Sequence, residues 1–436
     1  MNQLQLFLPC AAGVEDYLAS EVGRITGQPT GQVQKWRGGV LLQGAWRDAL
    51  LLNLHCRLAQ RVLVQLFHAQ YRNEQDLYRV ASEVAWEIWF TPRQSIKVEV
   101  TAQHSPLTSL NFAALKIKDA LCDRFRAKAG GVRPDVNTQW PDIRIYAHLT
   151  TDTVSLYIDT SGEALFKRGW REDKGEAPLK ETLAAAIIAA SGWADDPEQP
   201  LYDPCCGSGT IAIEAAQIAC NLAPGSQRRF AFEKMLPFQE HVWSAIQSGA
   251  VQAQRPLPPG AKPHIFGSDV AHRMVDFAQR NAQRAGVADA IEFRGGDALQ
   301  RLPPTDVPGV MLVNPPYGER IAAAGVAGVA GADAAGQRRG LAAQRTDEGA
   351  PAAAGRELAQ TLDGGDFFVQ LAAHWKKNYA GWTAWMLTPD LKLPGKMRLK
   401  ESRRVPMWNG PIECRLFRFD MVRGSARGEV VAQQAN

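Results

Sequence analysis

Four polar side chains follow short apolar stretches that we expect to form β-strands: Asp203, Asp269, Asp297 and Asn314. In open α/β sheets, ligands bind at the carboxyl ends of the strands. A carboxylate there can accept hydrogen bonds from ribose hydroxyls, and the third acid is placed to contact an adenine amino group. A lone aspartate after a strand is more often a helix cap or turn former. Three acids in this order, together with a glycine-rich turn, predict a nucleoside site.

That turn reads Asp-Pro-Cys-Cys-Gly-Ser-Gly-Thr (203–210) and leads into an apolar helix. Gly207 and Gly209 allow backbone angles forbidden to other residues and let a ligand approach the main chain. The helix that follows offers free amide groups and a partial positive charge. The turn is neither G-x-G-x-x-G nor a P-loop. Cys205 is expected to be a small neutral residue under the ligand rather than a redox group. The predicted ligand contacts in this turn are Asp203, Pro204, Cys205, Gly207, Ser208 and Gly209.

The fourth strand delivers Asn-Pro-Pro-Tyr (314–317) to the same edge of the sheet. The amino group of a nucleobase is a poor nucleophile because its lone pair is delocalised into the ring. The Asn314 side-chain oxygen and the Pro315 carbonyl could accept both amino hydrogens and direct the remaining electron density at an electrophilic carbon. Pro315 and Pro316 restrict the backbone of these acceptors, and Tyr317 could stack on a base taken out of its helix. A proline-rich turn without function would be the better interpretation of Asn-Pro-Pro alone.

Composition limits the class of protein. The chain has 436 residues and a net charge of +4, which is too mild to establish nucleic-acid binding. Seven cysteines without a CxxC pair or zinc-ligand spacing indicate reduced thiols and no metal site. The N-terminus lacks signal-peptide features, and no apolar run is long enough to cross a bilayer. We therefore expect a soluble, cytoplasmic protein without a membrane partner, and a monomer.

Two basic clusters are candidate RNA surfaces. Residues 114–133 hold six lysines and arginines against two aspartates on a predicted helix, and residues 392–418 hold eight against two glutamates. A solvated helix face would explain the first cluster on charge alone. The later sequence Phe-Lys-Arg-Gly-Trp-Arg (166–171) favours RNA, because cations interleaved with an aromatic suit an unpaired base and its phosphates. The predicted RNA contacts are Lys116, Lys118, Arg124, Arg168, Trp170, Arg171, Lys400, Arg403 and Arg404.

The pattern along the chain predicts an α+β module followed by alternating strands and helices of a parallel sheet. The module is expected to contain a helix over 13–25, a long helix over 47–66, a helix over 111–128 and a strand pair at 143–149 and 153–159. Asp269 lies 66 residues beyond Asp203, where about 20 is usual. We interpret residues 221–263 as an inserted loop or short helix near the site. Residues 321–356 are mostly alanine and glycine, and we expect them to be disordered or loosely helical.

The strand, acid and turn resemble motif I of class I S-adenosylmethionine-dependent methyltransferases. The N-terminal half resembles THUMP-domain RNA methyltransferases, through Phe-Leu-Pro-Cys (7–10), Gly-Val-Glu (13–15), Lys-Ile-Lys-Asp-Ala (116–120), Asp-Ile-Arg (142–144), Leu-Tyr-Ile-Asp-Thr-Ser-Gly (156–162) and Arg-Gly-Trp-Arg (168–171). Pro-Leu-Lys-Glu-Thr-Leu-Ala-Ala (178–185) resembles the family's segment before motif I. Within the family, the sequence is most similar to bacterial large-subunit rRNA guanine-N2-methyltransferases, from its start to about residue 420.

The resemblance implies a Rossmann-like methyltransferase domain with a mostly parallel seven-stranded sheet, preceded by a ferredoxin-like and THUMP RNA-binding module. It implies S-adenosylmethionine as cofactor and 23S rRNA, or a large-subunit assembly intermediate, as partner. It assigns catalysis to Asn314, Pro315, Pro316 and Tyr317, and adds Lys180, Glu181, Thr182 and Asn314 to the cofactor contacts. The expected parts are 1–46 (ferredoxin-like), 47–160 (THUMP), 161–180 (linker), 181–424 (methyltransferase) and 425–436 (tail).

Alternatives remain at this stage. A tRNA guanine would be attacked by the same chemistry, and Asn-Pro-Pro-Tyr also occurs in adenine-N6 and glutamine-amide methyltransferases. The THUMP resemblance argues against DNA or protein as substrate. A catalytically silent rRNA-binding assembly factor is opposed by the intact motifs. Some relatives continue into a second methyltransferase domain, which this sequence does not match, so we expect a single activity.

Overall fold

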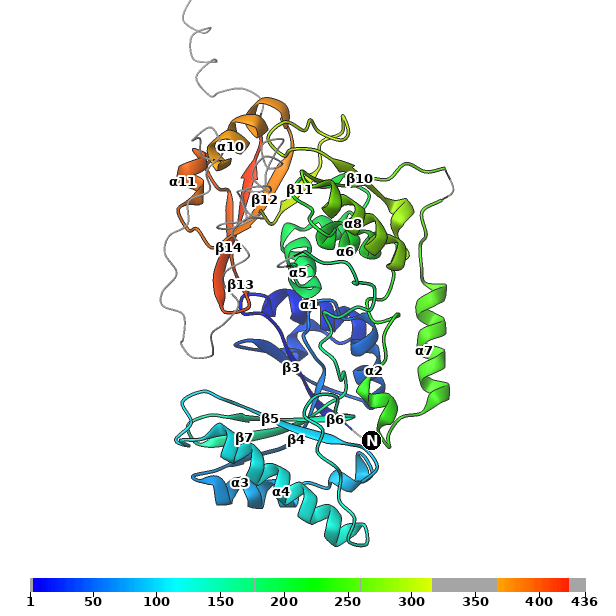
Figure 1. Cartoon of the computed structure of the whole chain (residues 1–436), viewed down its shortest axis with the longest axis vertical. Coiled ribbons are helices and arrows are strands. Elements are labelled where there is room, and N and C mark those ends of the chain that lie inside the picture. The colour runs from blue at the N-terminus through cyan, green and yellow to red at the C-terminus, as the bar shows by residue number, and fades with distance from the viewer. Residues whose placement is uncertain (1–2, 176–177, 259, 316–366, 423–436) are drawn as a thin grey trace, which may run out of the picture. The chain divides into compact units, whose positions relative to one another are not determined.

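The computed structural model describes residues 3–175, 178–258, 260–315 and 367–422 (Figure 1). The chain divides into two compact units. The first contains Met1–Gly169, Glu181–Ala186 and Asn221–Arg255, and the second contains Trp170–Lys180, Ile187–Cys220 and Pro256–Asn436. No helix in the described residues is long and apolar enough to cross a membrane.

The first unit is built on a seven-stranded sheet in the order β2-β3-β1-β4-β7-β6-β5, in which only the β5–β6 pairing is parallel. Its strands are β1 (Leu4–Pro9), β2 (Gln34–Trp36), β3 (Gly39–Gly44), β4 (Leu63–Gln70), β5 (Ile96–Ala102), β6 (Ile143–Leu149) and β7 (Thr153–Asp159). Its helices are α1 (Glu15–Thr26), α2 (Trp46–His55), α3 (Glu74–Glu83), α4 (Leu110–Lys128) and α7 (Glu240–Gln252), with short 3₁₀ turns at Thr30–Gln32, Trp86–Ile88 and Ala231–Lys234.

Local sequence explains several of these elements. Every second residue of β6 is buried, which matches its alternation of apolar and polar side chains. The Asn73 side chain caps α3 by accepting hydrogen bonds from the amides of Gln75 and Asp76. The predicted helix over 111–128 and the predicted strand pair are confirmed as α4 and as the antiparallel strands β6 and β7.

The predicted long helix over 47–66 is wrong, because α2 ends at His55 and β4 begins at Leu63. The buried Glu21 carboxylate of α1 explains the ending: it accepts the backbone amides of Arg57 at 2.9 Å and Leu58 at 3.0 Å. Amides held by a side chain outside the helix cannot continue its i→i−4 pattern.

The segment 221–255 falls within 221–263, which the sequence predicts to be an inserted loop or short helix near the site; its nearness to the site remains a prediction. It contains α7 and belongs to the first unit. The Gly225 amide donates to the Leu54 carbonyl at 2.9 Å, and the Arg228 guanidinium donates to four carbonyls. These carbonyls belong to Ser161, Glu163, Ala164 and Lys167. An arginine with several fixed acceptors holds a chain segment in one place, so this insertion has a structural role in the first unit.

The second unit contains a seven-stranded sheet in the order β10-β9-β8-β11-β12-β14-β13, parallel from β10 to β12 and antiparallel at β14 and β13. Its strands are β8 (Leu201–Asp203), β9 (Ile265–Asp269), β10 (Ile291–Gly295), β11 (Val310–Val313), β12 (Thr383–Thr388), β13 (Arg403–Asn409) and β14 (Ile412–Asp420). The helices are α6 (Thr210–Ala219), α8 (His272–Arg284), α10 (Phe367–Asn378) and α11 (Leu393–Met397); α5 (Glu181–Ser191) begins in the first unit and ends in the second.

Helices cover this sheet on the pattern of a doubly wound fold. The α6 and α8 helices contact each other and the strands β9 and β10. The α10 helix contributes Leu371 and Trp375 to a core that includes Met311 and Val313 of β11. Alternate residues of a strand share a face, so α10 covers one face of the sheet there. The predicted α/β class with a mostly parallel seven-stranded sheet is confirmed.

Candidate active site

The four predicted polar residues lie at one edge of the second sheet. The strands β10, β9, β8 and β11 are adjacent and parallel. Asp203 ends β8, Asp269 ends β9, Asp297 follows β10 by two residues, and Asn314 follows β11. Parallel strands bring their carboxyl ends together, so this edge is the position where such sheets bind ligands.

The turn after β8 has the conformation that its glycines suggest. Gly207 has φ +51° and Gly209 has φ +86°, both in the left-handed region. A Cβ on Gly209 would lie 2.9 Å from Ala278 Cβ, whereas a Cβ on Gly207 would meet no atom within 4 Å. Gly209 is therefore required by packing against α8, and Gly207 leaves an open face that a ligand could approach.

Asp269 bonds the turn with one carboxylate oxygen and its own loop with the other. Its Oδ2 accepts the Gly207 amide at 3.0 Å, and its Oδ1 accepts the Ala271 amide at 2.9 Å. The Cys206 amide donates to the Ser268 carbonyl at 2.9 Å, so two bonds join the turn to the end of β9. A carboxylate oxygen can accept a second donor, which leaves Asp269 capable of bonding a ligand hydroxyl.

Two of the acids at the sheet edge, Asp203 and Asp269, are removed from solvent, which raises the pKa of each. Burial, and secondarily the charge of Asp269, raises the pKa of Asp203 to about 8. Burial also raises the pKa of Asp269. Clustered acids of this kind favour a ligand that carries positive charge or hydrogen-bond donors, because such a ligand relieves both the repulsion and the desolvation.

Cys205 lies where the three acids converge. Burial raises the pKa of its thiol well above the ordinary value, and nearby carboxylates raise it further: Asp203, Asp269 and Asp297. A thiol kept neutral in this way is not a reactive nucleophile. This agrees with the expectation that Cys205 is a packing residue.

Asp297 also shapes its own loop. Its Oδ1 accepts the Leu299 amide at 2.9 Å, and its carbonyl accepts the amides of Gln300 and Arg301. The Arg301 carbonyl is held in turn by His374 Nε2 at 2.7 Å and by the Tyr379 hydroxyl at 2.9 Å. Asp297 therefore acts as a turn former, the alternative role named above. Its contact with adenine remains a prediction.

The remaining predicted catalytic and cofactor-binding residues differ in burial, and two of them lie outside the described residues. Asn314 is half-buried and Pro315 is buried, whereas Pro316 and Tyr317 lie outside the described residues. Pro204 stands inside the turn, and Ser208 is buried there. Lys180 is exposed just before α5; Glu181 and Thr182 are buried in the first turn of that helix, within the first unit. Their cofactor role therefore remains a prediction.

Two predicted RNA contacts are corrected because their side chains are buried. Trp170 is 1% exposed, so its ring cannot stack on an incoming base. Arg168 is 2% exposed and donates to the carbonyls of Leu165 at 2.9 Å and Arg57 at 2.8 Å. Both residues stabilise the fold. A buried arginine is rare unless it is paired, so charge counting along the sequence could not reveal this role.

Arg171 is half-buried, and its predicted contact with RNA remains a prediction. Its guanidinium donates to the hydroxyls of Ser208 and Thr210, both at 2.8 Å, and so contacts the cofactor turn. Sequence reasoning missed a further residue there, Asn281, whose side-chain amide donates to the Ser208 carbonyl at 3.1 Å. A polar residue in an otherwise apolar stripe of α8 was the only available signal for Asn281.

The basic residues of α4 differ from one another. Arg124 is held by the Glu87 carboxylate through two bonds of 2.8 and 2.6 Å, and its predicted contact with RNA remains a prediction. Lys118 pairs with Asp119 at 2.6 Å. Lys116 lies 5.3 Å from the ring centre of Phe112 and is half-buried. Surface pairs are weak, so Lys116 and Lys118 remain predicted RNA contacts.

Lys400, Arg403 and Arg404 are exposed next to or on β13. β13 is the last strand in the order of this sheet. Arg404 pairs with Glu401 at 2.6 Å and lies over the ring of Phe417. The exposure of Lys400, Arg403 and Arg404 is what a contact with RNA requires, and the contact itself remains a prediction.

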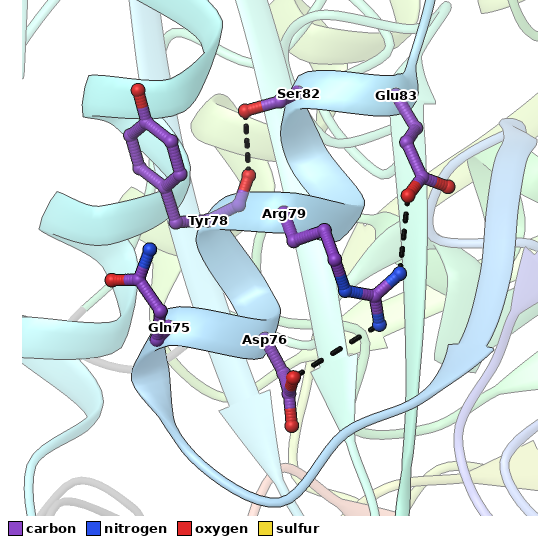
Figure 2. A pocket seen from close by; sticks show the side chains of 6 residues that line it. All are labelled: Gln75, Asp76, Tyr78, Arg79, Ser82 and Glu83. Carbon is purple, nitrogen blue, oxygen red and sulfur yellow. Dashed lines mark hydrogen bonds and ion pairs between the residues drawn. The ribbon is translucent and has the colours of Figure 1, made fainter.

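A hollow on the first unit is not part of this site. Figure 2 shows its six lining residues, all from α3, with Arg79 between Asp76 and Glu83. It contains no backbone turn of the kind that holds a nucleoside. Among the described residues, no three His, Cys, Asp or Glu side chains are grouped as metal ligands would be.

The second unit has the fold of class I methyltransferases, a class of enzymes that use S-adenosylmethionine as methyl donor, and a THUMP domain precedes it in the sequence. Three family models match: the RlmL ferredoxin-like domain over residues 5–63, the THUMP domain over 71–159, and the RMKL-like methyltransferase domain over 168–327. The predicted family and domain types are confirmed.

The chain is similar to proteins named ribosomal RNA large subunit methyltransferase K/L. It is 34% identical to the protein of Psychromonas ingrahamii, over 98% of this chain and 52% of that one. It is also 34% identical to that of Aeromonas hydrophila, over 99% of this chain and 57% of that one. The chain therefore spans about half the length of the curated relatives it matches. A methyltransferase crystallised with SAH is 26% identical, with a TM-score of 0.77, over 98% of this chain and 100% of that one.

Proposed function

We propose that the chain transfers a methyl group from S-adenosylmethionine to the N2 amino group of a guanine in large-subunit rRNA. The observation that carries this proposal is that three acids, Asp203, Asp269 and Asp297, follow adjacent parallel strands beside the glycine turn, with Asn314 after the neighbouring strand β11. The names of the relatives support ribosomal RNA of the large subunit as the substrate class.

The site residues fit S-adenosylmethionine. The open face at Gly207 admits a ligand to the backbone, and the first turn of α6 presents amide groups there. Asp269 and Asp297 retain acceptor capacity for the hydroxyl and amino groups of an adenosine. The buried acids favour a cationic ligand, and the bound cofactor supplies an electrophilic methyl carbon.

Asn314 and Pro315 would activate the target base. Two oxygens that accept both hydrogens of an exocyclic amino group hold that group in one orientation and favour the charge that develops on its nitrogen. The rigid backbone at Pro315 reduces the ordering cost. In this proposal Tyr317 stacks on the base, and Lys116, Lys118, Lys400, Arg403 and Arg404 contact RNA phosphates.

The test is methyl transfer from labelled S-adenosylmethionine to total RNA from cells that lack the protein, followed by nuclease mapping. Asn314→Ala serves as the inactive control. Label as N2-methylguanosine in large-subunit rRNA would support cofactor, chemistry and substrate together. Label in tRNA would retain the chemistry and reject the substrate. Cofactor binding without label in any RNA, including ribosomal precursors, would reject the proposal.

A further inference from the structure

The segment 170–173 lies against the cofactor turn and is fixed there by its own contacts. Arg171 donates one hydrogen bond to each of the hydroxyls of Ser208 and Thr210, which flank Gly209 at the start of α6. Ser208 and Thr210 are both buried. Arg171 thus links Ser208 and Thr210, whose backbone determines the conformation of the turn and the orientation of the first amides of α6.

The position of Arg171 is itself determined by neighbours. Its guanidinium carbon lies 4.9 Å from the ring centre of the buried Trp170, and Nη2 also reaches the Leu179 carbonyl at 3.4 Å. The Trp170 carbonyl accepts Arg284 Nε at 3.0 Å. A planar guanidinium stacked on an aromatic ring and aimed at fixed acceptors loses little further freedom on bonding.

Asn281 supports the same turn from α8. Its side chain is fully buried, and its Nδ2 donates to the carbonyls of Ser208 at 3.1 Å and Asp173 at 2.8 Å. Its Oδ1 accepts Arg284 Nη2 at 2.6 Å. One amide therefore connects the cofactor turn to the segment 170–173.

Asp173 completes the connection. It pairs with Arg280 at 2.8 Å and with Arg284 at 2.6 Å, and these two arginines hold the pKa of its carboxyl well below the usual range. Both arginines lie on α8, the helix that carries Asn281. The turn, the segment and the helix form one network of charge-assisted hydrogen bonds.

We propose that Arg171 and Asn281 are positioning residues of the cofactor site, which makes segment 170–173 part of that site. This inference rests on the proposed binding of S-adenosylmethionine. The two residues hold Ser208 from its hydroxyl and its carbonyl, so the open face at Gly207 and the first amides of α6 are ordered before the ligand arrives. Such pre-ordering lowers the cost of binding.

The positioning role of Arg171 is tested by comparing the variants Arg171→Lys and Arg171→Ala with the wild-type chain. Dissociation constants for S-adenosylmethionine are measured by calorimetry and those for rRNA by filter binding. Lysine keeps the charge but cannot donate to both hydroxyls in a fixed fork. We expect the dissociation constant for S-adenosylmethionine to rise about tenfold in both variants, as the loss of about one charge-assisted hydrogen bond predicts, with affinity for RNA within twofold.

A double-mutant cycle separates this role from a general effect on folding. In a Ser208→Ala/Thr210→Val background the effect of Arg171→Ala should shrink to less than threefold, because both hydroxyl acceptors in the turn are gone and only the Leu179 carbonyl remains. Arg229→Ala is the control, since Arg229 is 92% exposed and pairs with Glu233. Folded Arg171 variants that bind S-adenosylmethionine within twofold of wild type, or that lose RNA affinity instead, would overturn the inference. Cofactor binding by the wild type without RNA methylation would reject only the proposed substrate.

Discussion

The Gly207 amide donates a 3.0 Å hydrogen bond to Asp269 Oδ2, so the turn after β8 is joined to the carboxylate that ends β9. A residue predicted to bind ribose thus also builds the turn that faces the ligand. The predicted binding role of Asp269 is therefore coupled to the structure of the turn, because one carboxylate serves a backbone donor and has capacity for a ligand donor. Substitutions at this edge should therefore be designed so that folding and binding are measured separately.

Asn314→Ala should reduce kcat by about 10²-fold or more, since one pre-ordered polar contact to the reacting group is lost. The dissociation constant for S-adenosylmethionine should change less than threefold. Single-turnover methylation and calorimetry measure the two effects. Asn314→Asp retains an acceptor oxygen and should keep more activity than the alanine variant; equal losses in both variants would contradict the role as acceptor.

The two glycines of the turn should respond differently to alanine. Gly209→Ala places a Cβ 2.9 Å from Ala278 and should lower the free energy of unfolding by about 2 kcal/mol, through crowding and a strained φ. Gly207→Ala meets no atom and should cost about 1 kcal/mol, but its methyl group points into the open face and should weaken cofactor binding. Urea unfolding measures the stability of the two variants, and calorimetry measures their affinity for S-adenosylmethionine. Equal losses of stability and of affinity in both variants would contradict the assignment of Gly209 to packing and of Gly207 to the ligand face.

The apo protein should lose stability as pH rises toward and through about 8. The folded pKa of Asp203 is about 8 and lies above its ordinary value of 3.8, so the folded state holds a proton that the unfolded state has released. The contribution of the Asp203 carboxyl to the free energy of unfolding is fully present below pH 4 and is lost by about pH 9. Asp203→Asn keeps the oxygen that accepts the Cys205 amide, and should melt at a higher temperature than wild type at pH 9 but not at pH 5. A constant difference in melting temperature across this range would refute the assignment.

Arg403→Ala/Arg404→Ala should weaken RNA binding and reduce the slope of log affinity against log salt by about 1 to 2, as expected for lost phosphate contacts. Filter binding at salt concentrations from about 50 to 200 mM measures both the affinity for RNA and its salt dependence. Trp170→Phe is the matched comparison: it should lower the melting temperature while leaving RNA affinity intact. RNA affinity that depends on Trp170 and not on Arg403 would reverse the assignment.

The sequence predicts for a physical reason that the acids and Asn314 lie at one edge of the sheet, and the strand order confirms this placement. Each motif there is local: an apolar strand, then a carboxylate, then a turn whose glycines can be read directly. Once the strands are parallel and adjacent, their carboxyl ends must meet. The distance along the chain between Asp203 and Asp269 therefore did not obscure their placement at the same edge of the sheet.

Side-chain exposure could not be read in the same way. Arg168, Trp170 and Arg171 form a basic and aromatic string that indicates RNA binding, but the fold buries the first two and turns the third toward Ser208. Likewise the helical pattern over 47–66 gave no sign that Glu21 would capture the amides after His55. These outcomes depend on partners that are distant in sequence.

The amino-acid sequence by itself determined the class of fold, the order of the acidic strand ends and the chemistry available at Asn314, because these follow from local patterns and short-range geometry. Only the tertiary structure decided which cations face solvent and which hold the molecule together. Burial and hydrogen-bond partners are properties of packed neighbours, so a charge that looks free in the chain can be the one that bonds the hydroxyls of Ser208 and Thr210.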